Sequence, residues 1–117
     1  MQSETLKQEL INLQANFCSA LSDPSRLLIL YALDEQPLNV TEICLTLAMS
    51  QSNVSKHLKI LKEKGLVAST KIGTVVTYSL VDKKVITALD LLRSIMRDDL
   101  KKRSDLINHP ILQAGSL

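Results

Sequence analysis

The chain has 117 residues, of which 45% are apolar, and a formal net charge of +2; this size and composition fit one globular domain and exclude a chain that is disordered by composition. Only 3% of the residues are aromatic, so the core must be aliphatic, which favours packed helices over a β-sandwich. No apolar run approaches the roughly 20 residues of a membrane span, and the first residues lack the pattern of a signal peptide, so we expect a cytoplasmic protein without a membrane partner.

The first predicted elements are two helices. Leu6, Leu10, Leu13 and Phe17 follow one another in steps of three and four, which predicts a helix over residues 3–20 with one long apolar stripe. Ser22-Asp23-Pro24 then ends this pattern and combines an N-cap residue with proline at the first helical position. A second helix is therefore expected, ending before residue 35, and because it is apolar almost all round it should be central in the core.

Two short helices joined by a turn are predicted next. Leu38-Asn39-Val40 is expected to be a short extended piece, after which Thr41 caps a helix over TEICLTLA. Met49-Ser50 is expected to form a tight turn in which Ser50 caps the following helix. Two short helices with a turn of about three or four residues between them form a helix-turn-helix.

The segment SNVSKHLKILKEKGLV, residues 52–67, is the most informative part of the chain. It predicts an amphipathic helix that stops at Gly65 and continues into a strand, with Val54, Leu58 and Leu61 facing inward. The outward face is polar at its N-terminal end and cationic further along, which suits the base edges and phosphates of double-stranded DNA. An ordinary solvated helix face is the alternative. The candidate DNA-binding residues on this face are Gln51, Ser52, Ser55, Lys56, Lys59 and Lys62.

A change of periodicity after Gly65 predicts a β-hairpin. Residues 66–80 are rich in Val, Thr and Ile and are centred on Ile72-Gly73-Thr74. A hairpin directly behind a helix-turn-helix is a wing, and Lys71 and Thr74 near its turn are further candidate DNA-binding residues. Residues 51–74 hold five lysines and one glutamate, a net charge of +4 in a chain of +2, which favours a nucleic-acid surface here.

The last predicted helix covers residues 83–103, with Asp82 as its cap. Its apolar residues form two stripes, so it must be buried on two faces. In a chain this small, the second cover is expected to come from another copy of the chain. We therefore predict a homodimer with dimerisation helices over residues 3–20 and 83–103. The predicted organisation is one winged domain over residues 1–104 and a C-terminal tail over residues 105–117.

These segments resemble the ArsR/SmtB family of winged-helix repressors. ALSDPSRLLILYAL (20–33) is similar to the family's signature, SQSNVSKHLKILKEKGLV (50–67) to its recognition helix and KIGTVVTYSL (71–80) to its wing. The resemblance covers about residues 15–100. It implies a winged helix-turn-helix, mainly α with a β-hairpin wing, a homodimer, and operator binding that an inducer releases. It also implies base contacts from Gln51, Ser52, Ser55 and Lys56, whereas His57 is expected to be a half-buried packing and hydrogen-bonding residue.

The chain departs from the best-known sensors of that family. The arsenic and cadmium sensors carry ELCVCDLC where this chain has PLNVTEIC, and the zinc and nickel sensors carry histidines on a last helix that has none here. No metal site and no cofactor are therefore predicted, and the inducer is unknown. Cys18 and Cys44 are the candidate sensor thiols, and the alternative is that both are small core residues.

The sequence thus predicts a homodimeric DNA-binding regulator with a pseudo-palindromic operator. It does not predict an enzyme, because no nucleophile-base pair, glycine-rich phosphate loop or paired acidic motif is present. The alternatives are a winged-helix module that binds protein and not DNA, and a regulator whose small-molecule or metal inducer acts without thiols.

Overall fold

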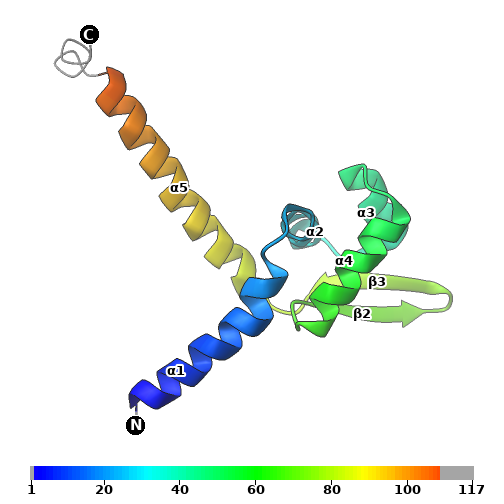
Figure 1. The fold of residues 1–117 in the computed structure, drawn as a ribbon. Coiled ribbons are helices and arrows are strands. Elements are labelled where there is room, and N and C mark those ends of the chain that lie inside the picture. Colours follow the sequence, from blue (N-terminus) through cyan, green and yellow to red (C-terminus); the bar gives the residue numbers. More distant parts are fainter. Residues whose placement is uncertain (1, 109–117) are drawn as a thin grey trace. The chain divides into compact units, whose positions relative to one another are not determined.

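The computed structural model describes residues 2–108. The elements in chain order are α1 (Gln2–Leu13), the π-helix η1 (Gln14–Cys18), α2 (Pro24–Glu35), β1 (Leu38–Asn39), α3 (Val40–Leu47), α4 (Gln51–Glu63), β2 (Val67–Ile72), β3 (Val75–Leu80) and α5 (Lys84–Asn108) (Figure 1). The chain divides into two units, one ending at Lys83 and one beginning at Lys84, and each is described by itself. The predicted helix-turn-helix and the predicted hairpin behind it are present, and both lie in the first unit.

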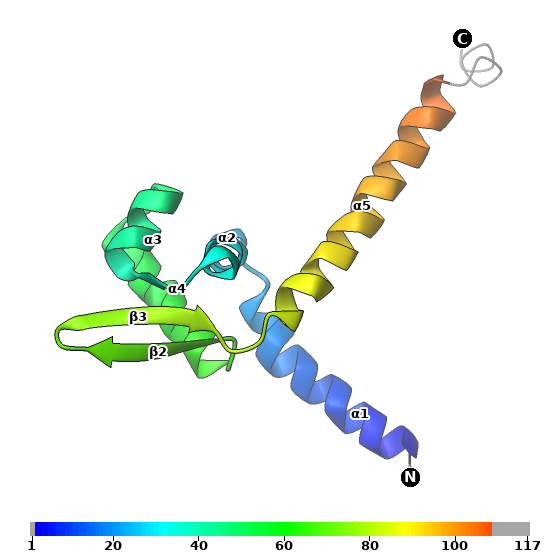
Figure 2. The ribbon, with the colours of Figure 1, turned by 180° about the vertical axis from the view of Figure 1, so that it is seen from behind.

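The predicted first helix is present as α1 followed by η1. In η1 the Ser19 N–H donates to the Gln14 carbonyl, the spacing of a π-helix. Asn16 Nδ2 donates to the Asn12 carbonyl at 2.9 Å, and in an α-helix this carbonyl would accept from the backbone N–H of Asn16. This side-chain hydrogen bond lies within the stretch where the helix widens. Figures 1 and 2 show α1 extending away from α2, α3 and α4.

The helix α2 supplies the centre of the core. Asp23 is its N-cap and Pro24 its first residue, as predicted, and Asp23 Oδ1 accepts from the backbone N–H of Ser25 at 2.8 Å. The helix packs against α3, α4 and β3. The buried apolar residues of the first unit are Ala20, Ile29, Leu30, Leu33, Leu38, Ile43, Val54, Leu58, Leu61, Leu66 and Val67.

The start of α3 corrects one expectation. Asn39, and not Thr41, is the N-cap: Asn39 Oδ1 accepts from the Glu42 N–H at 2.8 Å, and Glu42 Oε1 accepts from the Asn39 N–H at 2.9 Å. This reciprocal pair is a capping box, which satisfies two helix-end donors where a threonine cap would satisfy one. The helix ends at Ala48 in the left-handed region, with φ of 53°. Ser50 then caps α4, as predicted.

The sheet has three strands, in the order β1-β3-β2. β2 and β3 pair in register from Val67↔Leu80 to Ile72↔Val75. A two-residue turn joins them, and its first residue, Gly73, has a positive φ of 64°. The sequence predicted the extended piece at 38–40 but not its pairing with β3, because a two-residue strand has no periodicity to detect. The β2–β3 hairpin extends past α2, α3 and α4 in both views (Figures 1 and 2).

The helix α5 is longer than predicted. It runs to Asn108 and not to residue 103, because no glycine or proline interrupts the chain before Pro110. Residues 105–108 of the predicted tail are therefore helical, and residues 109–117 lie outside the described residues. Six large apolar side chains of α5 are between 58% and 65% exposed in the single chain: Leu91, Leu92, Ile95, Met96, Leu100 and Leu106. Among residues 2–108, no helix is long and apolar enough to cross a bilayer.

Candidate nucleic-acid interface

The helix α4 has one buried face and one exposed face. Val54, Leu58 and Leu61 are at most 1% exposed, and His57 is 6% exposed. These four residues point into the first unit, so the opposite side of the helix is turned to solvent. All six residues predicted on that side are exposed: Gln51, Ser52, Ser55, Lys56, Lys59 and Lys62. The predicted candidates therefore share one surface.

The N-terminal turn of α4 is polar and open. Ser50 Oγ accepts from the Asn53 N–H at 3.3 Å and lies 3.4 Å from Ser52 Oγ. Asn53 itself is exposed in this turn, a residue that the sequence prediction left out. Its amide is a base-reading group of the same kind as Gln51, since either can donate to and accept from one adenine edge. Its position one turn into a capped helix was the signal that could have identified it.

The wing is attached to α4 by a hydrogen bond. Lys62 Nζ donates to Ser69 Oγ on β2 at 2.7 Å. Lys71 lies two residues further along β2 and is on the same face of the strand as Ser69, because side chains alternate along a strand. Lys71 and Thr74 are both exposed, with Thr74 in the turn. The predicted residues of the wing thus follow the C-terminal, lysine-bearing part of the exposed α4 face. All of the predicted DNA-binding residues on α4 and the wing are exposed.

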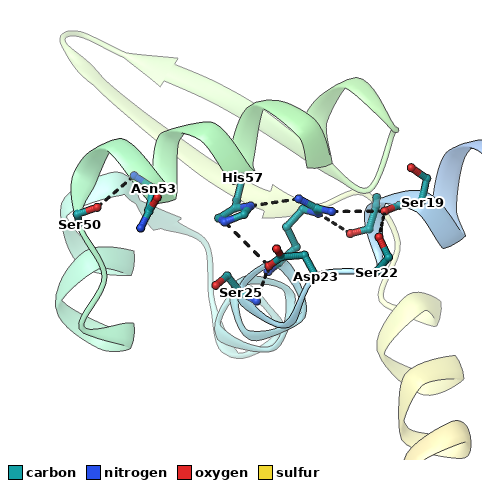
Figure 3. Close-up of polar contacts among 9 residues, drawn as sticks. Ser19, Ser22, Asp23, Ser25, Ser50, Asn53 and His57 are labelled. Carbon is teal, nitrogen blue, oxygen red and sulfur yellow. Dashed lines mark hydrogen bonds and ion pairs between the residues drawn. The ribbon is translucent and has the colours of Figure 1, made fainter.

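A polar cluster fixes the buried side of α4 (Figure 3). His57 points from α4 toward Asp23 at the start of α2, and His57 Nε2 lies 4.0 Å from Asp23 Oδ1. Arg26 Nη1 lies 3.2 Å from His57 Nδ1. Since arginine can only donate, Nδ1 is the acceptor in this contact. His57 is therefore a packing and hydrogen-bonding residue, as expected, and is more deeply buried than expected.

Asp23 keeps its negative charge in this cluster. Partial burial acts to raise the pKa of Asp23, but the backbone N–H groups of Ser25 and Arg26 and the nearby His57 and Arg26 side chains outweigh it and hold the pKa below its ordinary value. The sequence identified Asp23 as a helix cap but not its position beside His57. That contact is long-range, and no local pattern indicates it.

The two candidate sensor thiols lie on different elements. Cys18 ends η1 and is exposed, whereas Cys44 is in α3 and is half-buried, and both are free. The structure does not join them. Within residues 2–108, no three His, Cys, Asp or Glu side chains lie close enough together to hold a metal ion.

Comparison with known proteins shows that the helix-turn-helix segment of this chain is similar to that of a known family of regulators. Residues 23–69 match the family model described as "Bacterial regulatory protein, arsR family". The transcriptional regulator NmtR of Mycobacterium tuberculosis is 42% identical over 76 residues, which are 65% of this chain and 63% of that regulator, so more than a third of the relative lies outside the match. The nodulation protein NolR of Rhizobium meliloti is 33% identical over 80% of this chain and 76% of its own length.

Two solved structures have the same fold. The homodimeric winged helix-turn-helix DNA-binding domain of Mb0332 from Mycobacterium bovis has a TM-score of 0.71 at 27% identity, covering 82% of this chain and 89% of that one. The transcriptional regulator HlyU from Vibrio vulnificus has a TM-score of 0.67 at 34% identity, covering 81% of this chain and 98% of that one. The predicted fold and family resemblance are confirmed, and the relatives are regulators and not enzymes, in agreement with the sequence prediction.

Proposed function

The chain belongs to the ArsR family of bacterial regulatory proteins, and we propose that it is a homodimeric repressor that binds a pseudo-palindromic DNA operator and is released by an inducer. The observation that carries the proposal is the two-sided α4, in which Val54, His57, Leu58 and Leu61 anchor the helix while its polar and cationic side is exposed. A helix held in this way can enter a major groove with its outer side chains free to bind.

The roles of the residues follow from their chemistry. Gln51, Ser52, Ser55 and Lys56 occupy the N-terminal half of the exposed face, where they would contact base edges. Lys59, Lys62 and Lys71 would contact phosphates and supply most of the salt-dependent affinity. Thr74, in the turn of the wing, would contact phosphate or the minor groove. A DNA partner requires the cytoplasm, which is the compartment that we propose.

The homodimer is supported by uncovered apolar side chains on both helices that the sequence assigned to dimerisation. Leu6, Leu10, Leu13 and Phe17 of the first helix are between 41% and 55% exposed, and the six large apolar side chains of α5 named above are between 58% and 65% exposed. Apolar stripes of this length are ordinarily covered by a partner. The Mb0332 domain, which has the same fold, is described as homodimeric. In a dimer, two α4 helices would reach half-sites about one helical turn apart, or a multiple of that.

A lysine variant tests the DNA interface. Changing Lys59, Lys62 and Lys71 together to alanine should weaken binding to DNA from upstream of the gene at least tenfold, and the dependence of log K on log salt should fall by about one unit for each lysine lost. Fluorescence anisotropy at several salt concentrations measures both quantities. Lys7, Lys101 and Lys102 are also exposed, so their triple alanine variant is a control with the same change of charge.

The lysine experiment also separates the two classes of function. Equal affinity of both triple variants and the wild type would contradict the DNA interface as assigned here. No DNA binding by the wild type, together with retained folding, would favour the winged-helix module that binds protein.

We further propose that the inducer signal reaches the chain through its thiols. Cys18 is exposed at the end of η1 and Cys44 is half-buried, so neither thiol is sealed in the core of the single chain. Anisotropy titrations of the reduced and the oxidised protein test this proposal. Weaker binding after oxidation that is lost in Cys18→Ser or Cys44→Ser would support it. Equal binding in both states would overturn it and point to a small-molecule or metal inducer that acts without thiols.

A further inference from the structure

Two cationic side chains connect the end of the first helix to α4. We call residues 14–20 the first-helix end; they comprise η1 and the two residues after it. Arg26 Nε donates to the Ala20 carbonyl at 2.6 Å, and Arg26 Nη2 donates to the Ser19 carbonyl at 3.4 Å. Lys64, the C-cap of α4, donates from Nζ to the Ala15 carbonyl at 3.1 Å. One short stretch of backbone thus contacts Arg26, which reaches the middle of α4 at His57, and Lys64 at the C-terminal end of α4.

The Arg26 contacts form a rigid bridge. The last carbonyls of a helix have no hydrogen-bond partner within the helix. A cation at that end also interacts favourably with the partial negative charge of the helix dipole. Arg26 donates to two of these carbonyls, of which that of Ser19 also accepts from Ser22 Oγ at 2.7 Å, and through its remaining terminal nitrogen it reaches His57 Nδ1 at 3.2 Å. Because the guanidinium is planar and its donors have fixed positions, the three acceptors cannot move independently of one another. A lysine has a single nitrogen and could not hold the same three groups.

The Lys64 contact lies on the part of the first helix where the hydrogen bonding is irregular. The Ala15 carbonyl belongs to η1, where the spacing of the backbone hydrogen bonds is that of a π-helix. Such π-helical turns are uncommon and frequently occur at functional positions. The irregular turn is therefore the point at which the first helix is tied to the C-terminal end of α4.

We propose that Arg26 is a positioning residue that couples the first-helix end to the DNA-facing helix α4, with His57 as its contact on α4 and Lys64 as a second link. Movement of the first helix, which we assign to the dimer interface, then changes the position of α4 through these contacts. The same coupling acts in the opposite direction, because linkage between two sites is reciprocal. The regulatory part of this inference rests on the proposed function; the coupling itself does not.

The coupling is tested in the free protein by amide hydrogen exchange. His57→Phe keeps a ring of similar size but removes the acceptor, whereas His57→Asn retains an acceptor near the position of Nδ1. His57→Phe should raise the exchange rate of the Leu21 amide, which donates to Phe17 in the first-helix end, by about fivefold or more. His57→Asn should stay within about twofold of the wild type. The amide of Leu30, in the buried centre of α2, reports global unfolding.

The exchange experiment has two results that would overturn the coupling. One is an unchanged Leu21 amide in His57→Phe. The other is an equal rise at Leu21 and Leu30, since that would mean a general loss of stability. Arg26→Lys keeps the charge and loses the bridge, so it should resemble His57→Phe. Lys83→Met is the matched control, because Lys83 Nζ donates to the Asp34 carbonyl at 3.2 Å, the same chemistry away from α4.

The consequence for DNA is measured by anisotropy. Arg26→Lys and His57→Phe should weaken binding to DNA from upstream of the gene about tenfold and to random DNA less than about twofold, because a misplaced α4 loses base contacts before phosphate contacts. His57→Asn and Lys83→Met should bind as the wild type does. Unchanged affinity for upstream DNA in Arg26→Lys would overturn the regulatory part. Failure of the wild type to bind DNA would refute the proposed function, and the exchange result would still decide the coupling.

Discussion

At the scale of single residues, the exposed face of α4 carries two kinds of side chain, which we propose make two kinds of contact with DNA. A hydroxyl or amide on the first turns can read a base edge, whereas an ammonium further along neutralises a phosphate of any sequence. Ser55 lies one turn after Gln51 on the exposed face of α4 and is itself exposed. It is therefore the residue at which loss of base reading can be observed with the least disturbance of the helix.

Ser55→Ala should weaken specific binding about fivefold, which corresponds to about 1 kcal/mol for one hydrogen bond, and leave binding to random DNA nearly unchanged. Alanine is a better helix former than serine, so the helix itself should not suffer. Parallel titrations against upstream and scrambled DNA measure the difference. Ser3→Ala, at an exposed serine of α1, is the control. Equal losses on both DNAs would mean that Ser55 does not read a base.

At the scale of elements, helix caps organise the first unit. Asp23, Asn39 and Ser50 begin α2, α3 and α4, and each accepts a backbone N–H of its own helix. The pKa of Asp23 is lowered in the folded state, so its charged form is more favourable there than in the unfolded chain and stabilises the fold. Its contribution to stability is therefore fully present above the unfolded pKa of about 3.9 and is lost as the pH falls through the lower folded value.

Comparison of the wild type with Asp23→Asn tests this dependence. Asparagine is an equally good cap but has no charge to titrate, so the variant should be less stable than the wild type at pH 6. The difference in the free energy of unfolding should shrink as the pH falls below about 4, and urea denaturation at a series of pH values measures it. A constant difference across that range would show that the charge of Asp23 is not what stabilises α2.

These elements also show what a sequence can and cannot reveal. Local signals identified the cap at Asp23, the turn at Ser50 and the hairpin turn at Gly73, because each depends on residues within a few positions of one another. The capping box of Asn39 and Glu42 is equally local, and the prediction of Thr41 as the cap was wrong. Pairing of β1 with β3 joins residues about 40 positions apart, and neither the helical pattern nor strand alternation carries that information.

In the candidate site, too, local features could be predicted from the sequence and long-range contacts could not. Every predicted residue on α4 and the wing is exposed, since exposure follows from helical and strand periodicity. The cluster of Asp23, Arg26 and His57 was not predicted, because which carbonyl or ring nitrogen a cation reaches depends on how separate elements pack. The sequence therefore identified the outer surface of α4 and missed the contacts that hold its inner surface.

At the scale of the whole molecule, the uncovered apolar side chains of α5 favour assembly. Leu92 is 58% exposed in the single chain. If a second copy covers it, Leu92→Glu puts an unpaired carboxylate on each side of the interface, at a cost of several kcal/mol. Sedimentation should then show monomers at concentrations where the wild type is dimeric. Thr87→Glu, at an exposed position of the same helix, should leave the dimer intact. A persisting Leu92→Glu dimer would locate the interface elsewhere.

The hydrogen bond from Lys62 to Ser69 has a consequence for the entropy of binding. An ammonium has three donors, and Ser69 occupies one of them, so two remain for a phosphate. Lys62 can therefore contact DNA without releasing the wing. The wing and α4 are held together before DNA arrives, and less conformational freedom has to be lost on association. Lys62→Met would remove one phosphate contact and would also loosen the link between the wing and α4. The loss of DNA affinity in Lys62→Met should therefore exceed the loss in Lys59→Met.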